Sequence, residues 1–257
     1  MLNNKSACIA VISVFLPFFA GCRDTGYRVE KIKVQHIEVT PDTPEDPRVA
    51  QFLAPYRDSL SALLGETMAY SPEYLAKNDR NGALGAWLGN LAMDRVGKYL
   101  KAQGITEPID AALFNAGGER TSLPAGDVKR SFVYEFMPFE NSYVLVKLRG
   151  EAMQEMFDYL SADARRGTFH PLGGINLVIR GTDGKVTARV GGKRFDSKKL
   201  YHVLTTDFLL KGGDNMNFFA KNEGVLDIKL KMRESIMDYL ADTDTITIPK
   251  DLRYEIR

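Results

Sequence analysis

Cysteine, histidine and net charge are all scarce in this sequence. Its 257 residues include two cysteines and three histidines, and the formal net charge is +1. A balanced charge creates no field that would concentrate DNA, RNA or acidic membranes, so no nucleic-acid polymer is expected as a partner. His36, His170 and His202 stand in unrelated contexts. A two-metal phosphoesterase centre needs several histidine and aspartate ligands, and three scattered histidines do not supply them in the usual way.

Common catalytic motifs are also missing. The sequence contains no Gly-x-Ser-x-Gly elbow, no P-loop and no Gly-x-Gly-x-x-Gly fingerprint. His202 lies within an alternating apolar run, where a packed or exposed side chain is more probable than a catalytic one. A hydrolase needs an activated nucleophile, an acid/base pair or a metal. We therefore expect no catalytic residues, no cofactor and no activity from this chain alone.

The N-terminus predicts export and a lipid anchor. A basic residue at Lys5 precedes an apolar run over 7–19, and small residues then lead to Cys22. The run is too short to span a bilayer, but this order of features is typical of a secretory signal. Phe19-Ala20-Gly21-Cys22 resembles a bacterial lipobox, with lipid attached to Cys22. The chain is then expected in the cell envelope, periplasmic or surface-exposed. The alternative is a buried apolar helix with an incidental cysteine.

The rest of the chain predicts one mixed α/β domain, with a mixed sheet flanked by helices. Residues 1–22 form the signal, 23–47 a tether with room for one strand, and 48–257 the folded domain. Cys8 would leave with the signal, so no disulfide is expected. Helices are predicted over 47–64, 84–103, 150–160 and 232–240, and strands over 111–114, 132–136, 143–148, 175–179, 186–190 and 201–205. A turn at 182–184 joins two of these strands as a hairpin.

Three loops carry residue combinations that favour ligand binding. The first has two glycines that permit close backbone approach, the amide Asn115 and the planar cation Arg120. The second places Phe139 after a proline at a strand end, and the third combines Phe208 with a Gly-Gly turn before Asp214. Taken singly, each has a structural interpretation: a glycine turn with a surface arginine, a core phenylalanine, or an ordinary loop.

Taken together and in this order, the three loops resemble the C-terminal domain of the 5'-nucleotidase family. That family's pattern reads approximately Asn-Gly-Gly-Gly-Ile-Arg, then Pro-Phe before an apolar strand, then Asp/Asn-Phe-Leu with Gly-Gly-Asp. The segments 88–91 and 146–150 are similar to the family as well, and the resemblance extends over about 60–240. The resemblance implies that a base stacks between Phe139 and Phe208. It also implies that Asn115 and Asp214 bind the ribose hydroxyls and that Arg120 faces phosphate.

Two positions depart from the family's pattern. Glu119 stands where the family usually has an apolar residue, and its charge is expected to oppose that of Arg120. Arg80 matches only approximately a further family arginine. In the family a separate N-terminal domain carries the metals. The resemblance therefore implies the recognition half of a split nucleotidase, completed by a separate metallophosphoesterase chain that holds the divalent metals. A nucleotide- or nucleoside-binding module without hydrolysis and an interaction domain with a degenerate pocket are the alternatives.

Overall fold

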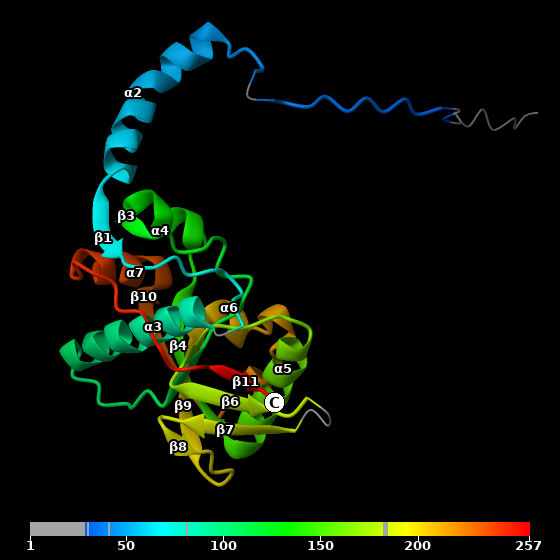
Figure 1. Ribbon diagram of the computed structural model, residues 1–257, viewed down its shortest axis with the longest axis vertical. Coiled ribbons are helices and arrows are strands. Elements are labelled where there is room, and N and C mark those ends of the chain that lie inside the picture. Colours follow the sequence, from blue (N-terminus) through cyan, green and yellow to red (C-terminus); the bar gives the residue numbers. More distant parts are fainter. Residues whose placement is uncertain (1–28, 30, 41, 81, 182–184) are drawn as a thin grey trace, which may run out of the picture. The chain divides into compact units, whose positions relative to one another are not determined.

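The computed structural model describes residues 29, 31–40, 42–80, 82–181 and 185–257 (Figure 1). The predicted signal segment with Cys22 and the predicted hairpin turn at 182–184 lie outside the described residues. Two compact units are present, Met1–Gln51 and Phe52–Arg257. In the first unit, the described residues before Pro47 form no strand, so the strand for which the tether had room is not found there.

Helices and strands alternate along the second unit. The helices are α2 (Pro47–Leu64, which begins in the first unit), α3 (Ala83–Ala102), α4 (Arg130–Phe136), α5 (Gly150–Arg165), α6 (Asp207–Leu210) and α7 (Met232–Ala241). The strands are β1 (Thr67–Ser71), β2 (Ala111–Leu113), β3 (Gly126–Lys129), β4 (Ser142–Arg149), β5 (Leu172–Gly173), β6 (Ile175–Ile179), β7 (Val186–Val190), β8 (Lys193–Arg194), β9 (Leu200–Thr206), β10 (Val225–Lys231) and β11 (Tyr254–Ile256). The 3₁₀ turns η2 (Gly213–Asn215) and η3 (Asn217–Lys221) follow α6.

A mixed five-stranded sheet forms the centre of the domain, with strand order β10-β4-β9-β2-β5. β2 and β9 pair in parallel, and the other neighbours pair antiparallel. A second sheet, β11-β6-β7-β8, and a two-stranded sheet of β1 and β3 complete the fold. The predicted mixed α/β class with a mixed sheet is therefore confirmed, and the antiparallel pairing of β6 with β7 matches the predicted hairpin.

Both faces of the central sheet are buried. Successive residues of β4 point in opposite directions: Tyr143 and Leu145 join a core with α3, α4 and α7, whereas Val144 and Val146 join a second core with α5. This is the period of two that a strand imposes on its side chains. Because helices pack on both faces, the loops at the ends of the strands remain accessible. The loops described below lie at such strand ends.

The predicted strand over 132–136 is wrong, because these residues belong to helix α4. Phe132, Val133 and Phe136 are buried in a group, and their spacing of three and four residues is helical. Short apolar runs of this length fit a strand or a buried helical turn equally well. The packing of this face against α7 and β3 decided the outcome.

Helix α2 has no buried residue, although it is clearly amphipathic in sequence. Its start is as predicted: the Asp46 carboxylate accepts a hydrogen bond from the Arg48 backbone N–H at 2.8 Å. Phe52, Tyr56 and Leu60 follow one another at every fourth position and are exposed by 54% or more. Among the described residues, no helix is long and apolar enough to cross a membrane.

Candidate functional site

The three loops meet at one end of the central sheet. Asn115 comes after β2 and Phe208 after β9, and these two strands are parallel neighbours, so their carboxyl ends share an edge. β4 is antiparallel to β9, with Tyr143 opposite Thr206, so the Phe139 loop enters β4 at that same edge. The loops are also joined directly, because the Ser142 backbone N–H donates to Asp207 Oδ1 at 3.0 Å.

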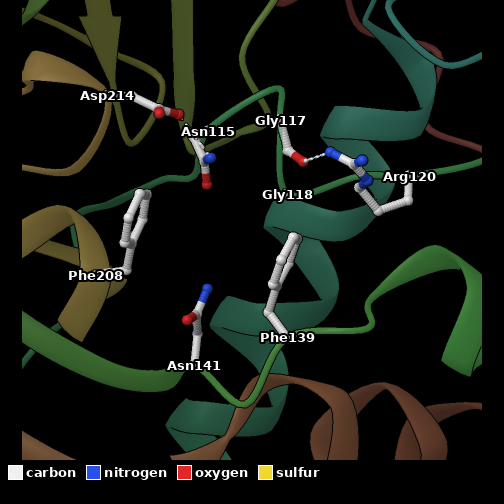
Figure 2. A pocket seen from close by; sticks show the side chains of 8 residues that line it. All are labelled: Asn115, Gly117, Gly118, Arg120, Phe139, Asn141, Phe208 and Asp214. Atoms are coloured by element: carbon white, nitrogen blue, oxygen red, sulfur yellow. Dashed lines mark hydrogen bonds between the residues drawn. The ribbon is translucent and has the colours of Figure 1, made fainter. Parts of the chain in front are cut away.

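Two phenylalanine rings form opposite walls of the resulting pocket. Figure 2 shows Phe208 and Phe139 facing each other across an open space. The two residues are 43% and 42% exposed, which is high for large apolar side chains. Facing rings that are this accessible offer two apolar surfaces to a flat ligand. The alternative of a core phenylalanine at Phe139 is therefore wrong.

A glycine gives Phe208 its position. A Cβ atom built on Gly213 would lie 2.4 Å from the Phe208 ring, which is closer than any side chain permits. Any larger residue at Gly213 would therefore push the ring into the pocket or out of its place. Contact with the Phe208 ring therefore explains why the second residue of the Gly-Gly turn, Gly213, is a glycine.

Asn115 and Asp214 form a polar pair in the lining of the pocket. Asn115 Nδ2 donates to Asp214 Oδ2 at 2.6 Å, although the two residues are 99 positions apart. Asp214 adopts φ 52°, a left-handed conformation that aspartate tolerates better than most residues. In Figure 2 Asn115 lies at one side of the gap between the two rings, and Asp214 lies beside it on the Phe208 side. An amide next to a carboxylate offers both a donor and acceptors to a ligand's hydroxyl groups.

Arg120 lines the same pocket from outside the aromatic pair. Its guanidinium lies 5.9 Å from the centre of the Phe139 ring, and Nη1 donates to the Gly117 carbonyl oxygen at 3.4 Å. Figure 2 shows the side chain on the side of Phe139 that faces away from Phe208. Arg120 is exposed and forms no ion pair with the other residues that the structure describes. Its positive charge is therefore available at the rim.

Glu119 does not oppose that charge, contrary to the sequence-based expectation. The residue is 2% exposed, and its Oε1 has no hydrogen-bond partner among the described residues. Burial raises the pKa of this carboxyl to about 8, and only the charge of Lys77 acts in the other direction. Glu119 is therefore largely protonated and neutral at pH 7.

All five predicted site residues line this one pocket of about 240 Å³, together with Gly117, Gly118 and Asn141. Drug-sized ligands occupy pockets of about 300–1,000 Å³. The space therefore suits a ligand, or the part of a ligand, that is smaller than a typical drug molecule. Asn141 was not predicted, although it belongs to the Phe139 loop. Its position beside the two rings could be recognised only after the loops had been brought together (Figure 2).

The histidines do not form a metal centre in the described part of the chain. No group of three or more histidine, cysteine, aspartate or glutamate side chains there could hold a metal ion. His202 pairs with Glu107 at 2.9 Å, and His170 pairs with Asp163 at 2.8 Å. These residues do not fit the metal pair of a phosphoesterase.

Comparison with known proteins places this pocket in a family context. The family model described as 5'-nucleotidase, C-terminal domain, matches residues 66–221. This range includes every residue that lines the pocket. Among curated proteins, the 5'-nucleotidase of Vibrio cholerae is 28% identical over 227 residues, covering 84% of this chain and 38% of that protein. The protein named silent protein UshA(0) of Salmonella typhimurium is 28% identical over 220 residues.

The fold agrees with the sequence match. A solved 5'-nucleotidase precursor from Thermus thermophilus superposes with a TM-score of 0.65 at 24% identity, covering 83% of this chain and 44% of that one. The present chain spans about 38% of the length of the curated relatives that it matches. The match thus concerns one domain of larger proteins. From its sequence, its fold and the loops at the sheet edge, this chain belongs to the 5'-nucleotidase C-terminal domain family.

Proposed function

We propose that the pocket binds the base and sugar of a nucleoside or nucleotide. The observation that carries the proposal is the pair of half-exposed rings, Phe139 and Phe208, which face each other beside the Asn115–Asp214 pair. A flat base gains stacking energy from each ring without regard to its identity. Calorimetric titration of the full chain with adenosine and AMP, before and after removal of the Phe208 ring, tests the proposal.

Asn115 and Asp214 would bind the ribose hydroxyls, since a carboxylate that accepts from ribose hydroxyls is a recurrent device. Arg120 would face phosphate. Its exposed guanidinium, with Glu119 neutral behind it, leaves a cationic fork at the rim. A phosphate that extends from a ribose held by Asn115 and Asp214 would reach the rim of the pocket. The planar guanidinium of Arg120 can bind it there in a bidentate manner.

We further propose that the chain is the recognition half of a split nucleotidase in nucleotide catabolism. A separate metallophosphoesterase chain would hold the divalent metals and carry out hydrolysis. One observation supports a partner: α2 carries an exposed apolar face of Phe52, Tyr56, Leu60 and Leu63. We assign the metallophosphoesterase to that face, because an exposed apolar stripe on a helix normally has a partner.

Phosphate release from AMP is expected to rise when the full chain is mixed with a metallophosphoesterase encoded beside it. The physical reason is that the pocket would hold the base and ribose while the partner's metals act on the phosphate, which converts an encounter into a positioned reaction. Phosphate assays of each chain alone and of the mixture measure this. Release from the mixture that equals release by the enzyme chain alone would contradict the split arrangement.

A matched variant tests the assigned face. Replacing Phe52 and Leu60 by aspartate removes half of the apolar stripe, yet neither side chain is buried, so the fold should be retained. We expect the mixture to lose its gain in phosphate release, while adenosine binding by the variant chain stays unchanged. Asp58→Asn alters the polar side of the same helix and provides the control.

A binding module that captures nucleotides without hydrolysis is the second candidate. It is favoured by the fact that all eight residues of the pocket come from this one chain. This candidate expects full affinity without any partner and no gain in the mixing assay. An interaction domain with a degenerate pocket would instead show no nucleoside binding.

We also propose that Cys22 carries the lipid that attaches the chain to a bacterial membrane. The support is the order of basic start, apolar run and Ala20-Gly21 before that cysteine. Cells fed radiolabelled palmitate are expected to label the wild-type chain but not Cys22→Ser. Cys8→Ser is the matched control and should retain the label, because Cys8 lies within the predicted signal. Equal labelling of wild type and Cys22→Ser would contradict the anchor.

A further inference from the structure

A polar cluster contacts the two loops that carry Asn115 and Asp214. Its members are the buried Asp163 near the end of α5, the half-buried Tyr159 one turn earlier, and the buried His170 in the segment before β5. His170 is 5% exposed. Its backbone is held on both sides by one hydroxyl, because the His170 N–H donates to Tyr254 Oη at 3.1 Å and that hydroxyl donates to the His170 carbonyl at 2.9 Å. The imidazole is therefore fixed in place.

Both ring nitrogens of His170 have partners. Nδ1 accepts the backbone N–H of Ala116 at 3.2 Å, and Nε2 lies 2.8 Å from Asp163 Oδ2. A nitrogen that accepts a hydrogen bond carries no proton, so the proton is on Nε2 and is donated to the carboxylate. This arrangement requires a neutral imidazole. Ala116 directly follows Asn115, and the ring thus holds the first loop by its backbone.

The second loop is held from the same helix. Tyr159 Oη donates to the Asp214 carbonyl oxygen at 2.9 Å, and the Tyr159 ring lies 5.6 Å from the His170 ring. Burial, together with the nearby Asp163 charge, raises the pKa of Tyr159 to about 12, so it stays a donor throughout the physiological range. The 2.6 Å bond from Asn115 to Asp214 then joins the two held loops at the pocket.

We propose that His170, Asp163 and Tyr159 are positioning residues that set the spacing between Asn115 and Asp214, and that loss of the His170 acceptor releases the first loop and weakens ribose binding. This inference rests on the proposed function of the pocket. Asp163 orients the imidazole, and Tyr159 fixes the other loop. None of the three lines the pocket itself.

Asp163 is itself held in place, because its other oxygen is engaged by Arg166. Without the Nδ1 acceptor, the partly buried Ala116 N–H would lose its hydrogen bond. A partly buried donor without a partner is costly, so the loop would move away from the ring.

The test is adenosine binding by the full chain, measured for the wild type and for two variants of His170. His170→Gln keeps an acceptor for the Ala116 N–H and should bind within about threefold of wild type. His170→Leu removes the acceptor and should bind about tenfold more weakly. Wild-type affinity in His170→Leu would overturn the proposal.

His202→Gln is the matched control, because His202 is also paired with a carboxylate but does not line or support the pocket. It should keep the wild-type affinity. Amide hydrogen exchange at Ala116 provides a readout without ligand: exchange should be faster in His170→Leu than in the wild type and in His170→Gln. Unchanged protection in His170→Leu would overturn the positioning role. Changed protection without adenosine binding in any variant would refute the proposed function and leave the positioning role standing.

Discussion

Phe208→Ala is expected to weaken the binding of adenosine and AMP by about 5- to 140-fold, equally for both ligands. Stacking of a base on an aromatic side chain contributes about 1–3 kcal/mol, and each 1.4 kcal/mol corresponds to a tenfold change in affinity. The loss should be similar for the two ligands, because the ring would contact the base and not the phosphate. Calorimetric titration of the full chain with each ligand measures it.

The structure predicts that this substitution leaves the fold intact. Phe208 is 43% exposed and packs on Gly213, so its removal creates no buried cavity. Phe139→Ala should have a similar effect on binding from the opposite wall. Tyr134→Ala provides the control, since Tyr134 is an aromatic residue of comparable exposure, 41%, that does not line the pocket. Unchanged affinity in Phe208→Ala, with the fold retained, would show that the base does not lie between the rings.

The second prediction with a large effect concerns stability. We expect the free energy of unfolding of the wild-type chain to fall as pH rises from 5 to 8, by on the order of 3 kcal/mol because of Glu119 alone. The folded-state pKa of this carboxyl is raised to about 8 from its ordinary 4.5. Between those two values the native chain keeps the proton that the unfolded chain releases. Stability from this group is therefore full below about pH 4.5 and declines as pH rises toward 8.

Glu119→Gln should remove most of this decline, because the amide has nearly the same shape and no charge to lose. Urea unfolding at pH 5, 6, 7 and 8 measures the free energy of unfolding of each chain. Glu135→Gln is the control, since Glu135 is an exposed carboxylate of α4 and should leave the wild-type slope unchanged. A slope in Glu119→Gln equal to that of the wild type would show that another group titrates.

Glu119 also has a consequence for ligand binding. A charged carboxylate next to Arg120 in the sequence suggested that the two charges would oppose each other. The structure buries Glu119 behind the loop and leaves Arg120 at the rim, so that neighbouring residues occupy different environments.

Much of the domain's local structure follows from sequence patterns. The long helices α3 and α5 have continuous apolar stripes, and strands β6 and β7 alternate regularly, so their types were predictable. α4 was not, because a seven-residue helix with clustered aromatic residues has no pattern distinct from a strand. Several short strands, such as β5 and β8 with two residues each, exist only because a neighbouring strand pairs with them.

The sequence by itself determined which loops hold ligand-type chemistry. Glycine pairs, an amide, an arginine and aromatic residues next to a proline or a glycine turn are local signals, readable without a fold. Only the tertiary structure decided that the loops share a pocket. The parallel pairing of β2 with β9 and the antiparallel entry of β4 bring Asn115 within 2.6 Å of Asp214 across 99 residues. The support from His170 and the burial of Glu119 likewise depend on contacts between distant segments, which no local pattern of residues encodes.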